Sequence, residues 1–385
     1  MKVVIAPSGF KESLSAEEAA KIIAKGIRNI LPDAEIAEVP LGDGGEGFTK
    51  TMMSATSGRI YKVPATGPTG KRIESHFGIF TDEDGKRVAV LEMAAAAGLS
   101  LVPKDQRNPF ATTTYGVGEL IKAALDKKVD KILLGNGDSG TNDGGAGAAQ
   151  ALGVKLLRKN GKDIKGSGTG LKHLAKIDLS GCDGRLNDVK IDVACNIKNI
   201  LCGEKGVARV FGPQKGATEK QVEEMSAALD KYAEIIKRDT GKDVAKMPGG
   251  GASGGLGAGL HALLGAEIHS RFDIVFKYFK LDEALKDADL VITAEGGLNF
   301  QTPNGKIPSE VARRAKKLNL PVVAIAGSLN KGARDNYEIG IDAIFSILRE
   351  PCTLEEAIDN APELLEKCAE NVMRTLLLGK QLKGK

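Results

Sequence analysis

The stretch that decides the fold is residues 131–153, KILLGNGDSGTNDGGAGAAQALG. It opens with a short apolar run, 132–134, that predicts a buried strand, and it ends with residues 148–152, which are typical of a helix. Between them lies a loop of glycines and small polar residues, here called the central loop (135–145). Glycines after a strand let backbone N–H groups approach an anion closely. Because ligands of open α/β sheets bind at the carboxyl ends of strands, we expect this loop to bind a ligand.

Strand–loop–helix units extend outward from this stretch towards both ends of the chain. Strands are expected at 3–6, 36–41, 191–195, 290–293, 322–325 and 343–347, and helices at 16–29, 117–125, 219–237, 309–318 and 363–378. The middle is more irregular and richer in β-structure. We therefore predict an α/β protein with a discontinuous flavodoxin- or Rossmann-like parallel-sheet domain, 1–70 and 285–385, and an inserted α/β domain, 71–284. The active site is expected in the cleft between the two domains.

Composition excludes several classes of protein. The 385 residues suit about two domains, and a net charge of +4 without a basic block argues against nucleic acid as a partner. No apolar run approaches the roughly 20 residues of a membrane span, and the first apolar run is too short for a signal peptide. Five cysteines without paired CxxC spacing indicate buried thiols in a reducing cytoplasm rather than a zinc site. We expect a cytoplasmic protein that acts on a small molecule, with a homodimer as a possibility.

Familiar catalytic motifs are absent or incomplete. Residues 135–140 match GxGxxG, but 141–145 interrupt the helix start and no acid follows a second strand at the expected place, which disfavours a dinucleotide site. A second match, at 249–254, follows no clear strand. The sequence holds no GxxxxGK[ST] and no GxSxG, so neither a P-loop nor a hydrolase triad has support.

The remaining pattern combines glycine loops, acids at strand ends and loop lysines. In the acid loop (42–47), Asp43 and Glu46 suit Mg²⁺ binding or a general base, although an Asp-Gly turn is an equal alternative. Lys11, Lys215 and Lys306 lie in loops, where each could hold a phosphate or lie solvated on the surface. Phosphoryl transfer needs such parts, which indicates a kinase or another phosphate-binding enzyme.

Eight ordered motifs give the chain its resemblance to a known family. They are IAPSGFKESLSA (5–16), PLGDGGEG (40–47), LEMAAAAGL (91–99), RNPFATTTYGVGELI (107–121), GDSGTNDGGAGAAQALG (137–153), LCGEKGVARVFGPQKGAT (201–218), PGGGASGGLGAG (248–259) and DLVITAEGGLNFQTPNGKIPSEVA (289–312). In these the chain resembles the bacterial glycerate kinase family over nearly its whole length. The resemblance implies phosphorylation of D-glycerate by ATP with Mg²⁺, at the 2-hydroxyl rather than the 3-hydroxyl.

The resemblance also implies the site residues. The catalytic candidates are Lys11, Asp43, Asp143, Asn196 and Glu295, with Asp43 and Asp143 as the candidate metal ligands. The candidates for binding substrate or phosphate are Ser8, Gly44, Gly45, Glu46, Ser139, Asn142, Gly144, Asn199, Gly254, Gly255, Gln301, Thr302 and Lys306.

Four positions depart from the family pattern. Asn196 and Lys198 stand where the pattern has acids, Gly297 stands for an arginine, and Asn299 for an aspartate. An amide cannot accept a proton as a base, and loss of a guanidinium removes a bidentate clamp for an anion. The departures leave two alternatives to a glycerate kinase: a kinase of the same fold that acts on another small hydroxy acid or polyol, and a catalytically silent paralogue that binds nucleotide.

Overall fold

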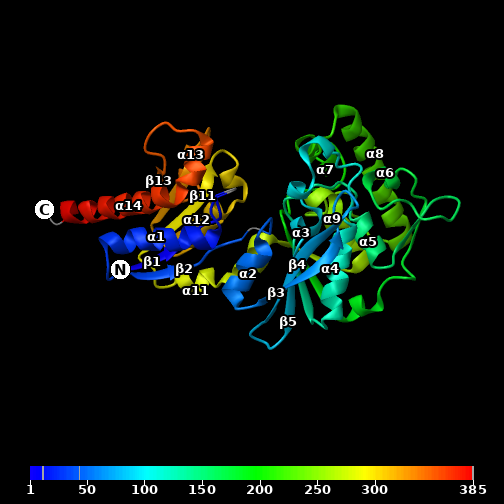
Figure 1. The fold of residues 1–385 in the computed structure, drawn as a ribbon, viewed down its shortest axis with the longest axis horizontal. Coiled ribbons are helices and arrows are strands. Elements are labelled where there is room, and N and C mark those ends of the chain that lie inside the picture. The colour runs from blue at the N-terminus through cyan, green and yellow to red at the C-terminus, as the bar shows by residue number, and fades with distance from the viewer. Residues whose placement is uncertain (11–12, 43, 384–385) are drawn as a thin grey trace. The chain divides into compact units, whose positions relative to one another are not determined.

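The computed structural model describes residues 1–10, 13–42 and 44–383, which form two compact α/β units (Figure 1). The first unit comprises Met1–Asp43 and Val275–Lys385, and the second comprises Gly44–Ile274. The first unit is discontinuous in sequence, and the second is inserted into it, as the sequence predicts. Lys11 and Asp43, two of the predicted catalytic residues, lie outside the described residues.

The unit boundaries differ from the predicted ones. Residues 44–70 are predicted to belong to the first domain, but β3 (Arg59–Thr66) pairs along its whole length with β4 (Arg72–Thr81) in the second unit. The helix α2 (Phe48–Thr56) packs on β4, where a Cβ on Gly78 would lie 2.4 Å from the sulfur of Met53. Residues 275–284 likewise belong to the first unit. A cleft between the domains stays a prediction.

The first unit is built on a five-stranded parallel sheet in the order β13-β12-β11-β1-β2. Its strands are β1 (Lys2–Ile5), β2 (Glu35–Glu38), β11 (Leu290–Leu298), β12 (Val322–Leu329) and β13 (Ala343–Ser346). Its helices are α1 (Ala16–Ile30), α11 (Leu281–Leu285), α12 (Ile307–Lys317), α13 (Leu354–Asp359) and α14 (Ala361–Lys383). The chain leaves β1 towards β2 on one side and continues through β11 to β13 on the other. The β1–β11 pair is therefore the topological switch point, where α/β proteins bind ligands.

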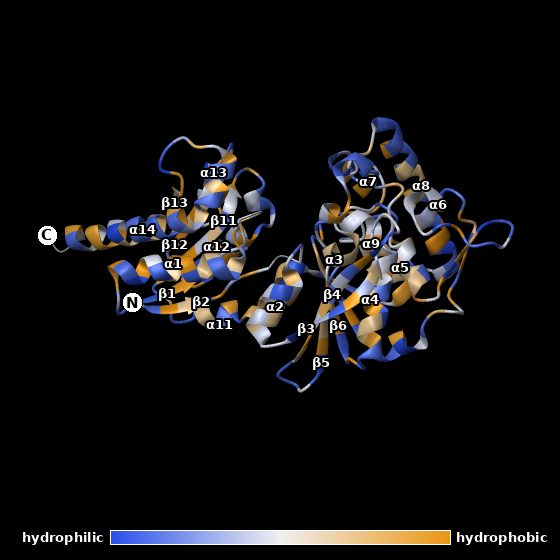
Figure 2. Ribbon diagram, viewed as in Figure 1, coloured by the Kyte–Doolittle hydropathy of each residue, from blue (hydrophilic) through white to orange (hydrophobic). Residues whose placement is uncertain are grey.

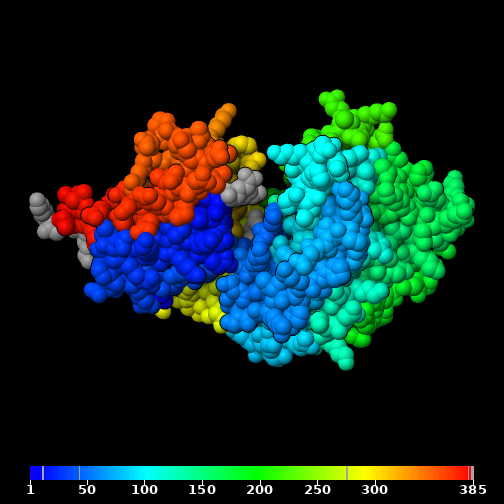
Figure 3. Space-filling view, in the orientation of Figure 1, coloured from blue at the N-terminus to red at the C-terminus, as the bar shows by residue number. Residues whose placement is uncertain are grey.

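The helices α1 and α14 pack against each other beside this sheet, as the blue and red segments of Figures 1 and 3 show. Gly26 permits the contact, because a Cβ there would lie 2.5 Å from the carbonyl oxygen of Glu366. Val3, Ile5, Ile292 and other alternate strand residues form one core with both helices. Figure 2 shows the matching stripes of hydrophobic and hydrophilic residues along α14.

The second unit is built on a six-stranded mixed sheet in the order β10-β9-β6-β5-β4-β3. Its further strands are β5 (Arg87–Glu92), β6 (Lys131–Gly135), β9 (Lys190–Cys195) and β10 (Glu267–Ser270), which run parallel to one another, with a separate hairpin of β7 (Lys155–Leu157) and β8 (Lys176–Asp178). Its helices are α2, α3 (Ala94–Ala97), α4 (Tyr115–Asp126), α5 (Ala146–Ala151), α6 (Gly168–Leu171), α7 (Val207–Phe211), α8 (Glu219–Thr240) and α9 (Ala252–Leu264), while α10 (Arg271–Phe279) crosses the boundary between the units.

Candidate active site

Four loops meet at the carboxyl ends of β5, β6 and β9 in the second unit. The part of the acid loop in this unit, Gly44–Gly47, lies directly on the central loop: a Cβ on Gly135 would lie 2.6 Å from the carbonyl oxygen of Gly44. A Cβ on Gly137 would lie 3.0 Å from the Cα of Gly45. Glycine is therefore needed here so that two backbones can pack on each other. The acid loop and the central loop are therefore neighbours in space.

Two carboxylates hold the acid loop through its backbone. Glu92, at the end of β5, is buried and accepts hydrogen bonds from Gly47 N (3.2 Å) and Thr49 N (2.7 Å) at the start of α2. Asp138 Oδ2 accepts a hydrogen bond from Glu46 N at 3.0 Å. Burial raises the pKa of Glu92, while the hydrogen bonds from Thr49 and Gly47 act in the opposite direction. The side chain of Glu46 is exposed.

Asp143, a predicted catalytic residue, organises the central loop from within. It is fully buried, and its Oδ2 accepts hydrogen bonds from Thr114 N and Thr114 Oγ1, both at 2.8 Å. Gly145 N and Gly147 N, at the start of α5, donate to the same carboxylate at 3.1 and 3.3 Å. Burial raises its pKa, and these hydrogen bonds oppose that shift. Because its oxygens already face four donors, the geometry does not support Asp143 as a base or a metal ligand.

The glycine loop (249–257) lies against the central loop. Gly144 N donates to Gly254 O at 3.0 Å, and a Cβ on Gly255 would lie 2.8 Å from Gly144 Cα. Ser253, Gly254 and Gly255 all adopt left-handed backbone angles. These three residues form a kink inside α9, which begins at Ala252. Three of the five glycines predicted to bind substrate or phosphate, Gly144, Gly254 and Gly255, are thus brought together.

Replacing Gly254 by alanine tests whether this close approach is required. A Cβ there would lie 1.9 Å from Thr141 O at a φ of +71°, so we expect a loss of at least about 3 kcal/mol in the free energy of unfolding. Gly265 is the matched control, because it has a φ of +74° with nothing within 4 Å of a Cβ; alanine there should cost only about 1–2 kcal/mol. Urea unfolding of both variants checks the difference, and equal losses would contradict the role of the contact.

The turn after β9 supports the glycine loop from the other side. Ile197 O and Asn199 O accept hydrogen bonds from Gly249 N (3.0 Å) and Gly251 N (3.1 Å). The side chain of Asn196 is half-buried, and its Oδ1 accepts a hydrogen bond from Lys198 N at 3.1 Å. Asn196 therefore serves as a turn residue in this structure, a part that an aspartate would play equally well.

A second group of predicted residues lies at the switch point of the first unit. Ser8, after β1, donates from its backbone N (2.8 Å) and its Oγ (3.1 Å) to Ala294 O in β11. The next residue, Glu295, is buried, and its Oε1 accepts hydrogen bonds from Thr302 Oγ1 (2.8 Å) and Lys306 Nζ (3.3 Å). Lys306 Nζ also donates to Gly297 O at 3.3 Å.

Gln301 stands apart from this group. Its side chain is exposed, and its backbone N donates to Asn299 Oδ1 at 2.8 Å. The structure therefore brings Ser8, Glu295, Thr302 and Lys306 together and leaves Gln301 at the surface.

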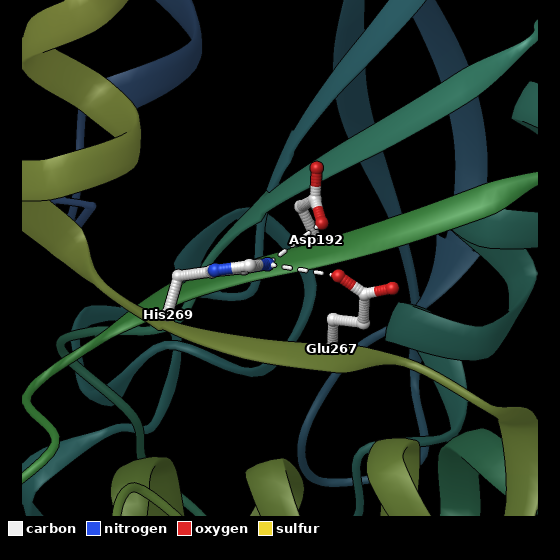
Figure 4. A group of neighbouring side chains, drawn as sticks. All are labelled: Asp192, Glu267 and His269. Carbon is white, nitrogen blue, oxygen red and sulfur yellow. Dashed lines mark hydrogen bonds and ion pairs between the residues drawn. The ribbon is translucent and has the colours of Figure 1, made fainter.

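A cluster of ionisable side chains on β9 and on the edge strand β10 of the six-stranded sheet is charge-balanced. Asp192, Glu267 and His269 point toward one another from β9 and β10, with ligand atoms within 4.8 Å (Figure 4). Lys131 Nζ lies 2.6 Å from Asp192 and Lys190 Nζ lies 2.8 Å from Glu267. Burial opposes ionisation of Asp192, but the contacts with Lys131 and His269 outweigh it and lower the pKa. We interpret the cluster as an ion-pair network that joins the edge strand to its neighbour.

Comparison with known proteins identifies the family. The sequence model of the glycerate kinase family matches residues 3–377. The chain is 48% identical over 370 residues to "Glycerate kinase" of Halalkalibacterium halodurans, covering 96% of this chain and 97% of that one. It is 47% identical over 384 residues to "Glycerate 2-kinase" of Escherichia coli K12, covering 100% of both chains.

A solved structure agrees with the fold. It is described as "putative glycerate kinase 2 from Salmonella typhimurium LT2"; its TM-score is 0.84 at 48% identity, covering 99% of this chain and 100% of that one. The protein therefore belongs to the glycerate kinase family, and the predicted family, fold class and enzyme class are confirmed. Within the described residues, no helix combines the length and apolarity that a bilayer crossing needs.

Proposed function

We propose that the protein transfers the terminal phosphoryl group of ATP to the 2-hydroxyl of D-glycerate, giving 2-phosphoglycerate and ADP. The observation that carries this proposal is the 47% identity, along the full length of both chains, with the relative named glycerate 2-kinase. The two groups of site residues support it, because each supplies parts that phosphoryl transfer requires. The compartment and the oligomeric state stay predictions.

The loops of the second unit supply backbone donors for phosphates. Gly144, Gly249 and Gly251 donate their own N–H groups to backbone oxygens and so fix the shape of the central and glycine loops, whose remaining N–H groups we assign to the phosphates. In the first unit, Glu295 is the carboxylate that we assign to the substrate hydroxyl, as the base that receives its proton. Lys306 forms an ion pair with Glu295. We assign this cation to stabilising the negative charge that develops on the substrate hydroxyl oxygen as it loses its proton.

We also propose that the reaction uses Mg²⁺, which supplies charge neutralisation when it is bound to the ATP phosphates. Asp143 does not fit a metal ligand, since four hydrogen-bond donors surround its carboxylate. Among the described residues of the acid loop, Glu46 is the acidic one, and its side chain is exposed. We assign no step of the transfer to the metal.

The product distinguishes the 2-hydroxyl from the 3-hydroxyl. Enolase converts 2-phosphoglycerate, but not 3-phosphoglycerate, into phosphoenolpyruvate, so a coupled assay without a mutase reports the position directly. We expect phosphoenolpyruvate to form at the rate of ADP release. ADP release that needs added phosphoglycerate mutase would place the phosphate on the 3-hydroxyl instead.

The substitutions at Asn196 and Gly297 favour the second candidate, a kinase for another hydroxy acid or polyol, and a double variant tests it. Asn196→Asp preserves the turn, and Gly297→Arg requires only a small shift of the Ser328 side chain, whose Oγ lies 3.2 Å from a Cβ there. Since Lys306 already donates to Gly297 O, we expect kcat/KM for D-glycerate to change by less than about threefold, well under 1.4 kcal/mol. A rise of about tenfold or more would favour the other substrate.

A further inference from the structure

Lys215 lies buried beneath the central loop, and the reaction as proposed above does not use it. It ends the short helix η4 (Pro213–Lys215), and 4% of its surface is exposed. Its Nζ donates to Ser139 Oγ at 2.7 Å, to Thr141 O at 2.8 Å and to Asn142 Oδ1 at 3.3 Å. A single side chain thus holds three polar residues within positions 139–142 of the loop.

A count of donors shows why the charge state matters. An ammonium group has three N–H donors, which match the three acceptors, and a hydroxyl that accepts from it must direct its own hydrogen elsewhere. A neutral amine has two N–H donors and one lone pair, so it satisfies Thr141 O and Asn142 Oδ1 and accepts the hydrogen of Ser139. The two states of Lys215 therefore differ in the direction in which Ser139 donates.

The surroundings of Lys215 place the change between its ammonium and amine forms near neutral pH. All three acceptors are uncharged, and burial lowers the pKa of Lys215 to about 7, against the field of Asp143, which favours the ammonium form. Arg107 lies beside the adjoining Gly216, where a Cβ would meet its side chain at 2.7 Å.

We propose that Lys215 is a positioning residue whose ammonium form turns the hydroxyl hydrogen of Ser139 away from itself and towards an anionic oxygen of a bound substrate. The proposal rests on the proposed function, in which the central loop receives an anionic group. That group is either a phosphate of ATP or the carboxylate of D-glycerate. Lys215 acts through Ser139 and does not itself touch the substrate.

The sign of the pH effect follows from the donor count. Below pH 7 the ammonium form dominates and Ser139 donates to the anion. Above it, the amine captures the hydroxyl hydrogen and presents the anion with a lone pair instead. The dissociation constant of the contacted substrate should therefore rise with pH, by about threefold or more between pH 6.5 and 8.5, since one lost hydrogen bond to a charged group exceeds 1 kcal/mol.

Calorimetric titration of ATP and, separately, of D-glycerate at pH 6.5, 7.5 and 8.5 tests the proposal on the full chain. In the wild-type protein we expect one of the two dissociation constants to rise with pH, which identifies the anion. In Ser139→Ala and in Lys215→Met that constant should be high and independent of pH, and the double variant should bind no more weakly than either single variant. Lys242→Met, which removes an ammonium that donates to His261 O, should keep the wild-type profile.

Several outcomes would overturn the proposal. A Ser139→Ala protein that retains the wild-type pH dependence shows that the hydroxyl is not the responding group, and this holds even if Lys215→Met fails to fold. Flat wild-type constants for both substrates also contradict it. Because the readout is binding, a protein that binds both substrates with the expected pH dependence but releases no ADP contradicts the proposed function and leaves the role of Lys215 supported.

Discussion

Replacing Asp143 by asparagine is expected to lower the free energy of unfolding by about 3–5 kcal/mol. The carboxylate accepts hydrogen bonds from Thr114 N, Thr114 Oγ1, Gly145 N and Gly147 N in a fully buried place. An amide turns one acceptor into a donor, so at least one of these groups loses its partner and faces a like group. Urea unfolding measures the loss.

The control for this variant is Asp178→Asn, which changes a carboxylate that accepts a hydrogen bond from Ser180 N at 2.9 Å in a surface turn. We expect it to cost under about 1 kcal/mol. The comparison separates a role of Asp143 in holding the central loop from a role in catalysis. An Asp143→Asn protein that is as stable as wild type but inactive would restore Asp143 as the catalytic residue predicted from the sequence.

Replacing Glu295 by glutamine is expected to lower kcat by about 100-fold or more, because loss of a general base costs roughly 10²–10⁴ in rate. Glutamine keeps an oxygen for the hydrogen bond from Thr302 Oγ1 but removes the charge beside Lys306. The fold should therefore persist while proton acceptance is lost. Steady-state ADP release with D-glycerate, together with the melting temperature, measures both effects.

Glu310→Gln is the matched control in the same unit, since Glu310 on α12 forms ion pairs with Arg313 and Arg314. We expect kcat for this variant to stay within about twofold of wild type, because such pairs contribute little and lie on a helix surface. If Glu295→Gln retained wild-type kcat, Glu295 would be a structural partner of Thr302 and Lys306, and the base would have to be sought elsewhere.

Local features of the fold could be predicted from the sequence because they depend on neighbouring residues. The sequence predicts helices at 16–29 and 219–237, and the structure shows a capping box of Ser15 and Glu18 at the start of α1 and a Thr218 cap on α8. The alternation of strands, loops and helices at both ends of the chain predicts the discontinuous parallel sheet, and the structure confirms it. The caps depend on residues three positions apart, so the sequence pattern contains their physical cause.

Features that depend on distant residues were missed. Glu92 holds the acid loop across 43 residues of sequence, and nothing in LEMAAAAGL indicates a carboxylate that faces backbone donors. The sequence predicts Lys215 as a loop lysine, but its burial against partners 73 to 76 residues away cannot be read from the chain. For Asp143 the residue type suggested chemistry, whereas the surrounding N–H groups, which only the fold supplies, indicate an organising role.

The measurement that tests the account most directly is ADP release from ATP and Mg²⁺ by the purified protein with D-glycerate, against a blank without glycerate. We expect release that depends on D-glycerate, saturates with it and is stoichiometric with phosphoglycerate. ATP binding without glycerate-dependent release would contradict the account, and release with other hydroxy acids or polyols but not with D-glycerate would assign the site to a different substrate.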